Sequence, residues 1–365
     1  MHPDVRFMKT ALREATRGFG ATSPNPRVGA VIVKDGHEII RSYHRAFGAL
    51  HAEADCLANL PRGAARGATL YVNLEPCCHH GKTPPCTQAI IKAGLRRVVY
   101  GVIDPNPLVN GRGLEELKKA GIEVHGPVLE DEARELNRGY FKFIRTNRPW
   151  VTLKMAQSLD GRIAAGSGDS RWISSPGSLK FAHRLRAEHD AVLIGVHTAL
   201  SDDPQLTVRQ VRGSNPKRVI LDTDLRLNPS AKIFAANPNP VLIATRPYPP
   251  ADKAEALQER GAEFIWLPPG RGNQLDLDVL LDELGQRGIL YLLVEGGSNV
   301  LGSFIRNSLY DEIIVVIAPK IIGGDGVPSV APLGIEKVDQ AVKLTAIKRK
   351  VFGPDLALWL RPESP

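Results

Sequence analysis

HAEADCL, residues 51–57, and PCCHHGKTPPC, residues 76–86, together hold all four cysteines of a 365-residue chain. The N-terminal segment MHPDVRFMKTALREA, residues 1–15, reads as an amphipathic helix and lacks the basic-then-apolar layout of a signal peptide. We therefore expect a cytoplasmic, reducing location. In that setting, clustered cysteines indicate a metal site or a catalytic site rather than a disulfide framework.

These two stretches contain the residue types that a catalytic zinc site requires. Such a site takes three protein ligands and leaves one position open for water. His51, Cys77 and Cys86 supply one imidazole and two thiolates, and Glu53 adds a carboxylate that does not bind the metal. A His-x-Glu segment followed by a Pro-Cys segment is typical of zinc deaminases, in which zinc lowers the pKa of its water to about 7. The glutamate then carries protons from this water to the ring and to the leaving ammonia, so the pattern predicts Glu53 as the catalytic residue.

The choice of the third ligand depends on an unusual spacing. Eight residues separate Cys77 from Cys86, where the commonest pattern has two. Cys78 adjoins Cys77, and adjacent residues rarely bind one tetrahedral ion together. Cys86 opens a predicted helix, where the helix dipole favours a thiolate. We therefore expect Cys86 to be the third ligand, while a structural four-ligand site that includes Cys78, His79 or His80 stays open as an alternative.

The first half of the chain alternates strand-like and helical segments, which is typical of a layered α/β domain. The strand-like segments are 28–36, 68–77 and 96–106, the helical segments are 51–60 and 86–95, and 113–124 is a helix followed by a strand. The stretch RTNRPW, 145–150, combines charge, a turn-forming Asn and a Pro without an apolar period, so it marks a boundary. We predict two domains, 1–146 and 147–365.

The second half is predicted to be a different α/β domain. Its apolar strand-like segments are 150–161, 190–196, 217–223, 240–245, 290–297 and 312–322. It lacks the G-x-G-x-x-G pattern of a Rossmann dinucleotide site. The stretch VEGGSNVLGSF, 294–304, follows a buried strand and predicts a phosphate-binding turn at a helix N-terminus. A tight strand-to-helix turn would need glycine as well, so this motif alone leaves both interpretations open.

The charge of the chain is concentrated in its first half. The net charge is +8, and residues 1–150 hold 22 Lys and Arg against 15 Asp and Glu, or +7. The remaining 25 of the 47 basic residues face 24 of the 39 acidic residues, or +1. A basic first half fits a phosphorylated or nucleic-acid substrate, and an ordinary solvated surface explains the excess equally well. No apolar run approaches the roughly 20 residues that span a bilayer, so we expect no membrane association.

Motifs along the whole chain resemble, in order, the bifunctional riboflavin-biosynthesis deaminase/reductase family. These motifs are SPNPRVGAVIV (23–33), HAEAD (51–55), LEPCCHHGKTPPC (74–86), LKMAQSLDGRIA (153–164), GDSRWISSP (168–176), LRAEHDAVLIGVHTALSDDPQLTVR (185–209) and VEGGSNVLG (294–302). The resemblance implies an N-terminal cytidine-deaminase-like α/β/α domain followed by a dihydrofolate-reductase-like α/β domain. It further implies one Zn²⁺ ion in the first domain and NADPH in the second.

The same resemblance implies two consecutive reactions. The first domain would remove the 2-amino group of 2,5-diamino-6-(5-phosphoribosylamino)pyrimidin-4(3H)-one by hydrolysis. The second would use NADPH to reduce the ribosyl group of 5-amino-6-(5-phosphoribosylamino)uracil to ribityl. Family motifs assign substrate binding in the first domain to Asn25, His44, His79 and Lys82, with Asp104 and Asn106 on the loop 104–113 as weaker candidates.

The resemblance also assigns residues of the second domain. Cofactor contacts are implied for Ala156, Trp172, Thr198, Asp202, Thr223, Gly297, Ser298, Asn299, Val300, Leu301, Gly302 and Ser303. Substrate contacts are implied for Ser170, Arg186, Leu206, Arg209 and Glu295. The two arginines are suited to hold a phosphate bidentately, and the glutamate to accept hydrogen bonds from ribose or pyrimidine groups.

Two functions of other classes compete with this interpretation. A deaminase that acts on a flipped base in tRNA shares the His-x-Glu and Pro-Cys segments. Two features weigh against this hypothesis: the eight-residue spacer between Cys77 and Cys86, and a second α/β half for which a base editor has no use. A non-catalytic nucleotide-binding regulator would not need intact zinc ligands and Glu53. We therefore expect phosphorylated pyrimidine substrates and no nucleic acid, while a homo-oligomer remains compatible with the sequence.

Overall fold

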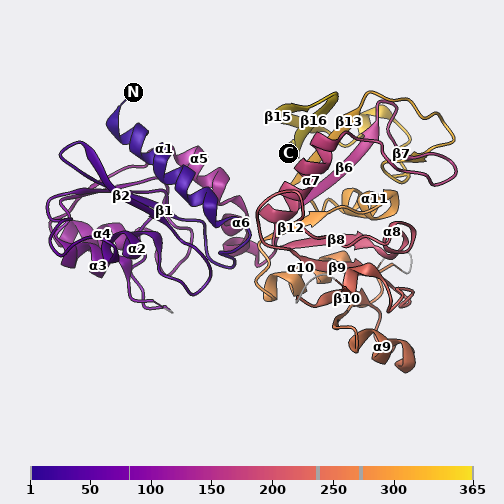
Figure 1. Ribbon diagram of the computed structural model, residues 1–365, viewed down its shortest axis with the longest axis horizontal. Coiled ribbons are helices and arrows are strands. Elements are labelled where there is room, and N and C mark those ends of the chain that lie inside the picture. Colours follow the sequence, from indigo (N-terminus) through magenta and orange to yellow (C-terminus); the bar gives the residue numbers. More distant parts are fainter. Residues whose placement is uncertain (1, 82, 236–238, 271–273, 364–365) are drawn as a thin grey trace. The chain divides into compact units, whose positions relative to one another are not determined.

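The computed structural model describes residues 2–81, 83–235, 239–270 and 274–363. The chain separates into two compact units, Met1–Asn147 and Arg148–Pro365, each with its own sheet (Figure 1). The division falls one residue after the boundary predicted at 146. Among the described residues, no helix is both long and apolar enough to cross a membrane.

The first unit is built on a five-stranded mixed sheet in the order β2-β1-β3-β4-β5. Strand β1 is antiparallel to β2 and β3, whereas β3, β4 and β5 are parallel. The strands are β1 (Gly29–Lys34), β2 (His37–Tyr43), β3 (Thr69–Val72), β4 (Arg97–Tyr100) and β5 (Glu123–His125). The helices are α1 (Pro3–Ala15), α2 (Ala52–Ala58), α3 (Cys86–Ala93), α4 (Arg112–Lys119), α5 (Glu130–Leu136) and α6 (Arg138–Thr146), with a 3₁₀ turn η1 (Thr16–Gly18).

Helices cover both faces of this sheet, because its central strands β1, β3 and β4 are apolar on both sides. In β1, Ala30 and Ile32 point to a core shared with α2, α3 and α4, while Val31 and Val33 point to a core shared with α1. This alternation follows from the two-residue period of a strand. Figure 1 shows α1 on one side of the sheet and the group α2, α3 and α4 on the other. The result is a three-layered α/β/α unit.

A buried ion pair fastens α1 to the sheet. Two guanidinium nitrogens of Arg97 on β4 donate to the carboxylate of Asp4, at 2.9 and 3.0 Å, and the Tyr71 hydroxyl donates to the same carboxylate at 2.8 Å. Burial raises the pKa of Asp4, but the hydrogen bonds from Arg97 and Tyr71 outweigh it, so the pKa lies below its ordinary value. The first helix is thus held by a charged contact that needs an ionised Asp4.

The second unit is built on a nine-stranded sheet in the order β11-β10-β9-β8-β12-β6-β13-β16-β15. The strands from β11 to β13 in this order are parallel, and β16 and β15 add an antiparallel edge. The strands are β6 (Trp150–Ser158), β8 (Ala191–Gly195), β9 (Lys217–Leu221), β10 (Val241–Thr245), β11 (Ala262–Trp266), β12 (Tyr291–Val294), β13 (Glu312–Ala318), β15 (Leu344–Phe352) and β16 (Asp355–Pro362). A separate ribbon pairs β7 (Arg162–Ala164) with β14 (Val327–Pro328).

Helices also cover both faces of this larger sheet. They are α7 (Pro176–Glu188), α8 (Val196–Asp202), α9 (Ala251–Gln258), α10 (Leu277–Gln286) and α11 (Ser298–Arg306), with 3₁₀ turns at η2 (Lys232–Phe234) and η4 (Val338–Gln340). In β8, Leu193 joins the core under α10 and α11, while Val192 and Ile194 join the core under α7, α8 and α9. Parallel strands covered on both faces have their carboxyl ends at one edge, where ligands bind in open α/β sheets.

Candidate active sites

Three predicted metal ligands meet in the first unit, although they come from three separate segments. His51 immediately precedes α2, Cys77 lies in the loop after β3, and Cys86 is the first residue of α3. Their ligand atoms all lie within 4.8 Å of one another, and Nδ1 of His51 is 3.4 Å from each sulfur. A tetrahedral zinc ion with ordinary bond lengths places such ligand atoms about 3.5–3.8 Å apart. The three residues therefore fit a zinc ion.

The pKa values of the two thiols in this group are shifted in opposite directions. A hydrogen bond from the Cys86 thiol and another from His51 lower the pKa of Cys77, although burial opposes them. The neighbouring Cys77 sulfur in turn raises the pKa of Cys86. The arrangement therefore makes one thiolate readily and leaves the second proton to be displaced when a cation binds.

Glu53 is the second residue of α2 and follows His51 by two positions. Its side chain is buried, and burial raises its pKa to about 7. Its Oε2 atom has no hydrogen-bond partner among the described residues. A buried, unpartnered carboxylate oxygen beside a metal-ligating group is suited to accept and return a proton near neutral pH.

Cys78 lies outside the metal-ligating group. Its sulfur donates to the backbone oxygen of Leu108 at 3.7 Å. Among the described residues, the group that could hold a metal contains three members and includes neither Cys78 nor His79 nor His80. This geometry favours a site with an open coordination position over the four-ligand alternative.

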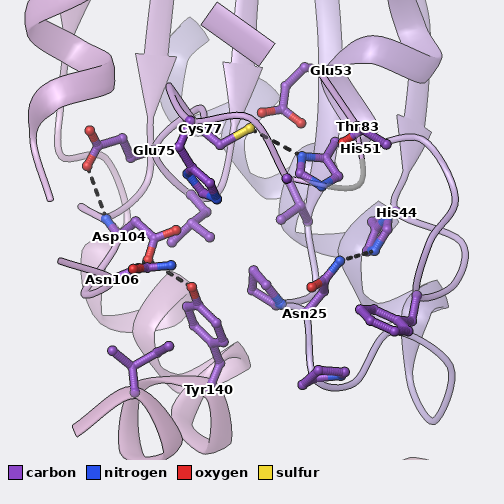
Figure 2. Close-up of a pocket in the computed structure, with 18 of the residues that line it drawn as sticks. Asn25, His44, His51, Glu53, Glu75, Cys77, Thr83, Asp104, Asn106 and Tyr140 are labelled. Atoms are coloured by element: carbon purple, nitrogen blue, oxygen red, sulfur yellow. Dashed lines mark hydrogen bonds between the residues drawn. The ribbon is translucent and has the colours of Figure 1, made fainter. Parts of the chain in front are cut away.

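The metal-ligating group opens into a cavity of about 290 Å³ (Figure 2). His51, Glu53 and Cys77 line one part of it. The residues with predicted substrate contacts that also line it are Asn25, His44, His79, Asp104 and Asn106. Lys82, the remaining predicted contact in this unit, lies outside the described residues. The structure thus brings the metal group and these five predicted contacts to one cavity.

Asn25 and His44 bind to each other at the cavity wall. The two side chains approach through Asn25 Nδ2 and His44 Nε2, which are 3.2 Å apart. The other ring nitrogen of His44 lies 3.0 Å from the backbone oxygen of Leu50. Burial lowers the pKa of His44, which favours the neutral ring.

Asp104 and Asn106 belong to a cluster that sequence reasoning saw only in part. The Tyr140 hydroxyl on α6 donates to Asp104 Oδ1 at 3.0 Å, and the backbone N–H of Asn106 donates to the same oxygen at 2.9 Å. Burial raises the pKa of Asp104 to about 6. Tyr140 was missed because an aromatic residue on an amphipathic helix is more often a packing residue.

Glu75 is a second residue that sequence reasoning missed. Its carboxylate is buried and accepts three backbone N–H bonds, from Asp104 at 3.2 Å, Gly111 at 2.8 Å and Gly113 at 3.0 Å. A Cβ atom at Gly113 would lie 2.1 Å from the Pro76 backbone oxygen, so only glycine permits this approach. Glu75 therefore ties the loop with Asp104 and Asn106 to the segment that leads into Cys77.

In the second unit, predicted contacts lie at the carboxyl ends of four adjacent parallel strands, β9, β8, β12 and β6. Ala156 is near the end of β6, and Thr198 follows β8 in α8. Thr223 follows β9, and Glu295 follows β12 directly. Contacts far apart in the sequence are thus placed at one edge of the sheet, which is where ligands bind in this class of fold.

The glycine-rich stretch forms a tight junction at this edge. Gly297 caps α11, whose first residues are those with predicted cofactor contacts, Ser298 to Ser303. A Cβ atom at Gly296 would lie 2.6 Å from Cβ of Val300, and one at Gly297 would lie 3.2 Å from the Thr198 hydroxyl oxygen. The glycines therefore permit close packing and also leave the helix N-terminus open to a phosphate group.

Arg186 and Glu295 form a buried ion pair in the second unit. Nε and Nη2 of Arg186 both donate to Glu295 Oε2, at 2.9 and 2.6 Å, and Glu295 Oε1 has no hydrogen-bond partner among the described residues. A third charged residue, Lys154 on β6, interacts with this pair. Burial lowers the pKa of Lys154, and the Glu295 carboxylate opposes that shift. Lys154 was not predicted, although a lysine inside an apolar strand is a signal that could have found it.

The other predicted residues of this unit lie on loops and at element ends. Arg209 donates through Nη1 to the Thr207 hydroxyl at 2.7 Å and to Gln205 at 3.0 Å, and Leu206 between them is buried. Ser170 and Trp172 lie on the loop between β7 and α7, and Trp172 is 65% exposed. Asp202 ends α8. Arg171 donates to the Asp202 backbone oxygen at 3.4 Å, which ties that loop to α8.

Comparisons with known proteins cover both units. Residues 1–102 match the family model for the cytidine and deoxycytidylate deaminase zinc-binding region, and residues 149–358 match the model for the RibD C-terminal domain. The riboflavin biosynthesis protein RibD of Aquifex aeolicus is 45% identical over 359 residues, which are 98% of each chain. The Escherichia coli K12 protein of the same name is 40% identical, over 98% of this chain and 99% of its own.

Solved structures agree along the whole chain. Acinetobacter baumannii RibD has a TM-score of 0.90 at 38% identity and covers 99% of both chains. A Thermotoga maritima protein described as a diaminohydroxyphosphoribosylaminopyrimidine deaminase/5-amino-6-(5-phosphoribosylamino)uracil reductase has a TM-score of 0.88 at 37% identity, again over 99% of both chains.

These matches confirm the predicted fold class, a cytidine-deaminase-like domain followed by a reductase domain of the RibD type, and they confirm zinc and NADPH as the expected cofactors. With its metal-ligating group and its glycine-rich sheet edge placed as described, the chain belongs to the RibD family of bifunctional riboflavin-biosynthesis enzymes, which join a deaminase to a reductase.

Proposed function

We propose that the first unit deaminates 2,5-diamino-6-(5-phosphoribosylamino)pyrimidin-4(3H)-one and that the second reduces the ribosyl group of the deaminated product to ribityl. The observation that carries the first half is the placement of Glu53, buried and with a free oxygen, beside the group of His51, Cys77 and Cys86. The name of the Thermotoga maritima relative, which lists both activities, supports the pairing of the two reactions.

The metal ligands and Glu53 would have different roles in deamination. His51, Cys77 and Cys86 would hold the zinc ion, which when bound makes its water acidic enough to react at neutral pH. Glu53 Oε2 would accept the two protons of the water in turn, and would deliver the first to the ring nitrogen and the second to the amino group, which leaves as ammonia. The buried position of Glu53 keeps bulk water from competing for that proton.

The rest of the first cavity would orient the substrate. Asn25, His44 and His79 line the cavity that the metal group also lines, and Lys82 completes the set implied by the family motifs. Asp104 and Asn106, held by Glu75 and Tyr140, would contact the phosphoribosyl part. A loop fixed at both of its ends keeps these contacts in place without a large ordering cost on binding.

The second unit would align NADPH, the hydride donor, with the opened ribose. The N-terminus of α11, with Gly297 and Thr198, would bind the pyrophosphate, while Ala156, Trp172, Asp202 and Thr223 border the remainder of the cofactor. Ser170, Leu206 and Arg209 would contact the substrate. Arg186 holds Glu295 in place through Oε2, and the buried Oε1 of Glu295, which has no hydrogen-bond partner among the described residues, would be an acceptor for the substrate.

The setting in which the protein acts is part of the same proposal. The two zinc-binding thiols must remain reduced, which favours the cytoplasm. The substrates are free phosphorylated pyrimidines and not bases in a nucleic acid. A cavity of about 290 Å³ has the volume of a small-molecule site.

One set of assays tests the proposal. The purified protein is incubated with the free pyrimidine phosphate or with tRNA, and ammonia release is measured. NADPH oxidation is then followed on the deaminated product, and metal content is determined by elemental analysis. Ammonia from the free pyrimidine, NADPH oxidation and one zinc ion per chain are expected. Ammonia from tRNA and not from the free pyrimidine would favour the base-editing alternative.

A further inference from the structure

The Asn25 amide and the His44 imidazole in the first cavity have hydrogen-bond partners within the protein for three of their four polar side-chain atoms. His44 is 2% exposed, and its two ring nitrogens meet Asn25 Nδ2 at 3.2 Å and the Leu50 backbone oxygen at 3.0 Å. Figure 2 shows the bond between Asn25 and His44 at the cavity wall. Both nitrogens of His44 therefore have protein partners, so neither is left for the direct substrate contact that the family motifs imply for this residue.

The chemistry of these partners sets the direction of each hydrogen bond. A backbone carbonyl oxygen only accepts, so the proton of His44 must be on Nδ1, facing Leu50. The remaining nitrogen of a neutral ring, Nε2, is then an acceptor. Asn25 must offer its NH₂ group to that acceptor, and its Oδ1 turns away from His44, as Figure 2 shows. Among the described residues, no hydrogen bond is recorded for this oxygen.

We infer that His44 is a positioning residue that fixes the polarity of the Asn25 amide, so that an acceptor and not a donor faces the bound ring. The inference rests on the proposed deaminase function. An acceptor selects a ring N–H or an amino group on the pyrimidine edge. An edge with a carbonyl or an unprotonated nitrogen at the same place would leave two acceptors facing each other, which is a costly mismatch.

Two conservative substitutions separate the two hydrogen bonds of His44. In His44→Gln, the longer side chain can place an amide oxygen near the former Nε2 and so keep the acceptor for Asn25. In His44→Asn, the shorter side chain can place an NH₂ group near the former Nδ1, which keeps the bond to Leu50 and loses the acceptor. Deamination kcat and KM, zinc content and NADPH-dependent reduction are measured for both variants in the full-length protein.

We expect His44→Asn to raise the deamination KM roughly tenfold with little change in kcat, because a binding contact is lost away from the reacting atoms. His44→Gln should raise the KM much less. Asn25→Leu should raise the KM as much as His44→Asn does, and the double variant Asn25→Leu/His44→Asn should raise it no further, since His44 acts through Asn25.

Three results would overturn the inference: equal KM values for the Gln and Asn variants, a further rise in the double variant, or loss of zinc in His44→Asn. The last would show that His44 supports the metal group instead. Failure of the proposed function looks different, because the wild-type protein itself would then release no ammonia from the free pyrimidine.

Discussion

The metal-ligating group of the first unit and the glycine-rich edge of the second unit are assembled in different ways. In the first, side chains with demanding chemistry, His51, Glu53, Cys77 and Cys86, come together from three segments that all lie between residues 51 and 86. In the second, the contacts follow four strands, and backbone shape matters as much as side chains, as the close approach of Gly296 to Val300 shows. A site built from reactive side chains is sensitive to single-atom changes, whereas a site built from backbone and many weak contacts loses function gradually.

The largest expected effect tests the first part of this comparison. Glu53→Gln keeps the shape of the side chain and removes its basicity, so deamination should fall by about 10²–10⁴-fold. Zinc content and NADPH-dependent reduction should be unchanged, since Glu53 is not proposed as a ligand. Ammonia release and elemental analysis on the same preparation check both statements, and a near wild-type deamination rate would remove Glu53 from its proposed role.

Metal content separates the two candidates for the third zinc ligand, Cys86 and Cys78. Cys86→Ser should lose most of the bound zinc, because it removes one of three ligands. Cys78→Ser is the matched control and should keep its zinc, since the Cys78 sulfur points to the Leu108 backbone oxygen. Zinc loss in the Cys78 variant with retention in the Cys86 variant would reverse the ligand assignment.

The comparison also assumes that the two regions belong to units of independent stability, which the ion pair of Arg97 and Asp4 tests. Arg97→Leu leaves a buried carboxylate without its cation and should destabilise the first unit by about 3–5 kcal/mol. Arg97→Lys, the control, keeps the charge and should cost less. Thermal inactivation of deamination should occur at a lower temperature, while that of NADPH-dependent reduction stays unchanged.

The pH dependence of this destabilisation follows from the pKa of Asp4. Because the folded-state pKa is lowered, the stabilisation is fully present above the unfolded value of about 4 and is lost as the pH falls through the folded value. The difference between Arg97→Leu and the wild type should therefore be largest near pH 7 and shrink below about pH 4. A penalty that is equal at both pH values would show that lost packing, not charge, is responsible.

A smaller effect tests the second region. Arg209→Ala should raise the KM for the deaminated phosphorylated substrate roughly tenfold to a hundredfold, because a charged hydrogen bond to phosphate is lost. The KM for NADPH should change little. Initial-rate kinetics with each substrate varied in turn distinguish the two. A change confined to NADPH would mean that substrate and cofactor contacts have been assigned to the wrong residues.

The smallest expected effect concerns the loop held by Glu75. Glu75→Gln places an NH₂ group against backbone N–H donors and should loosen the loop of Asp104 and Asn106. We expect a rise in the deamination KM of about five- to tenfold, without zinc loss. Metal analysis is again the control, and a variant that loses zinc would show that Glu75 supports the metal group more than the loop.

The metal group was predictable from sequence because its residue types are rare and chemically specific. The two α/β halves were predictable from alternating apolar segments. The sequence did not reveal β2, whose residues are mostly exposed and lack an apolar alternation, nor the exposed edge strand β15. Glu75 and Tyr140 were missed because their importance lies in hydrogen bonds to the backbone and to Asp104 that no spacing indicates.

The pairing of Arg186 with Glu295 shows the same limit in the second unit. The two residues lie 109 positions apart, and the arginine was expected to hold a phosphate. In the structure the Arg186 guanidinium group donates to the Glu295 carboxylate, so a phosphate contact of Arg186 stays a prediction. Pairing between charges distant in sequence depends on the strand order, which the apolar pattern alone does not specify.

Each unit has its own hydrophobic core, and the clusters of buried residues include no member common to both. In genetic terms, this separation means that inactivating mutations should fall into two complementation groups. A cell that expresses one copy with Glu53→Gln and another with a damaged second unit should still make the final product. Its two defective chains would each perform the step that the other has lost, and the intermediate would pass between them by diffusion.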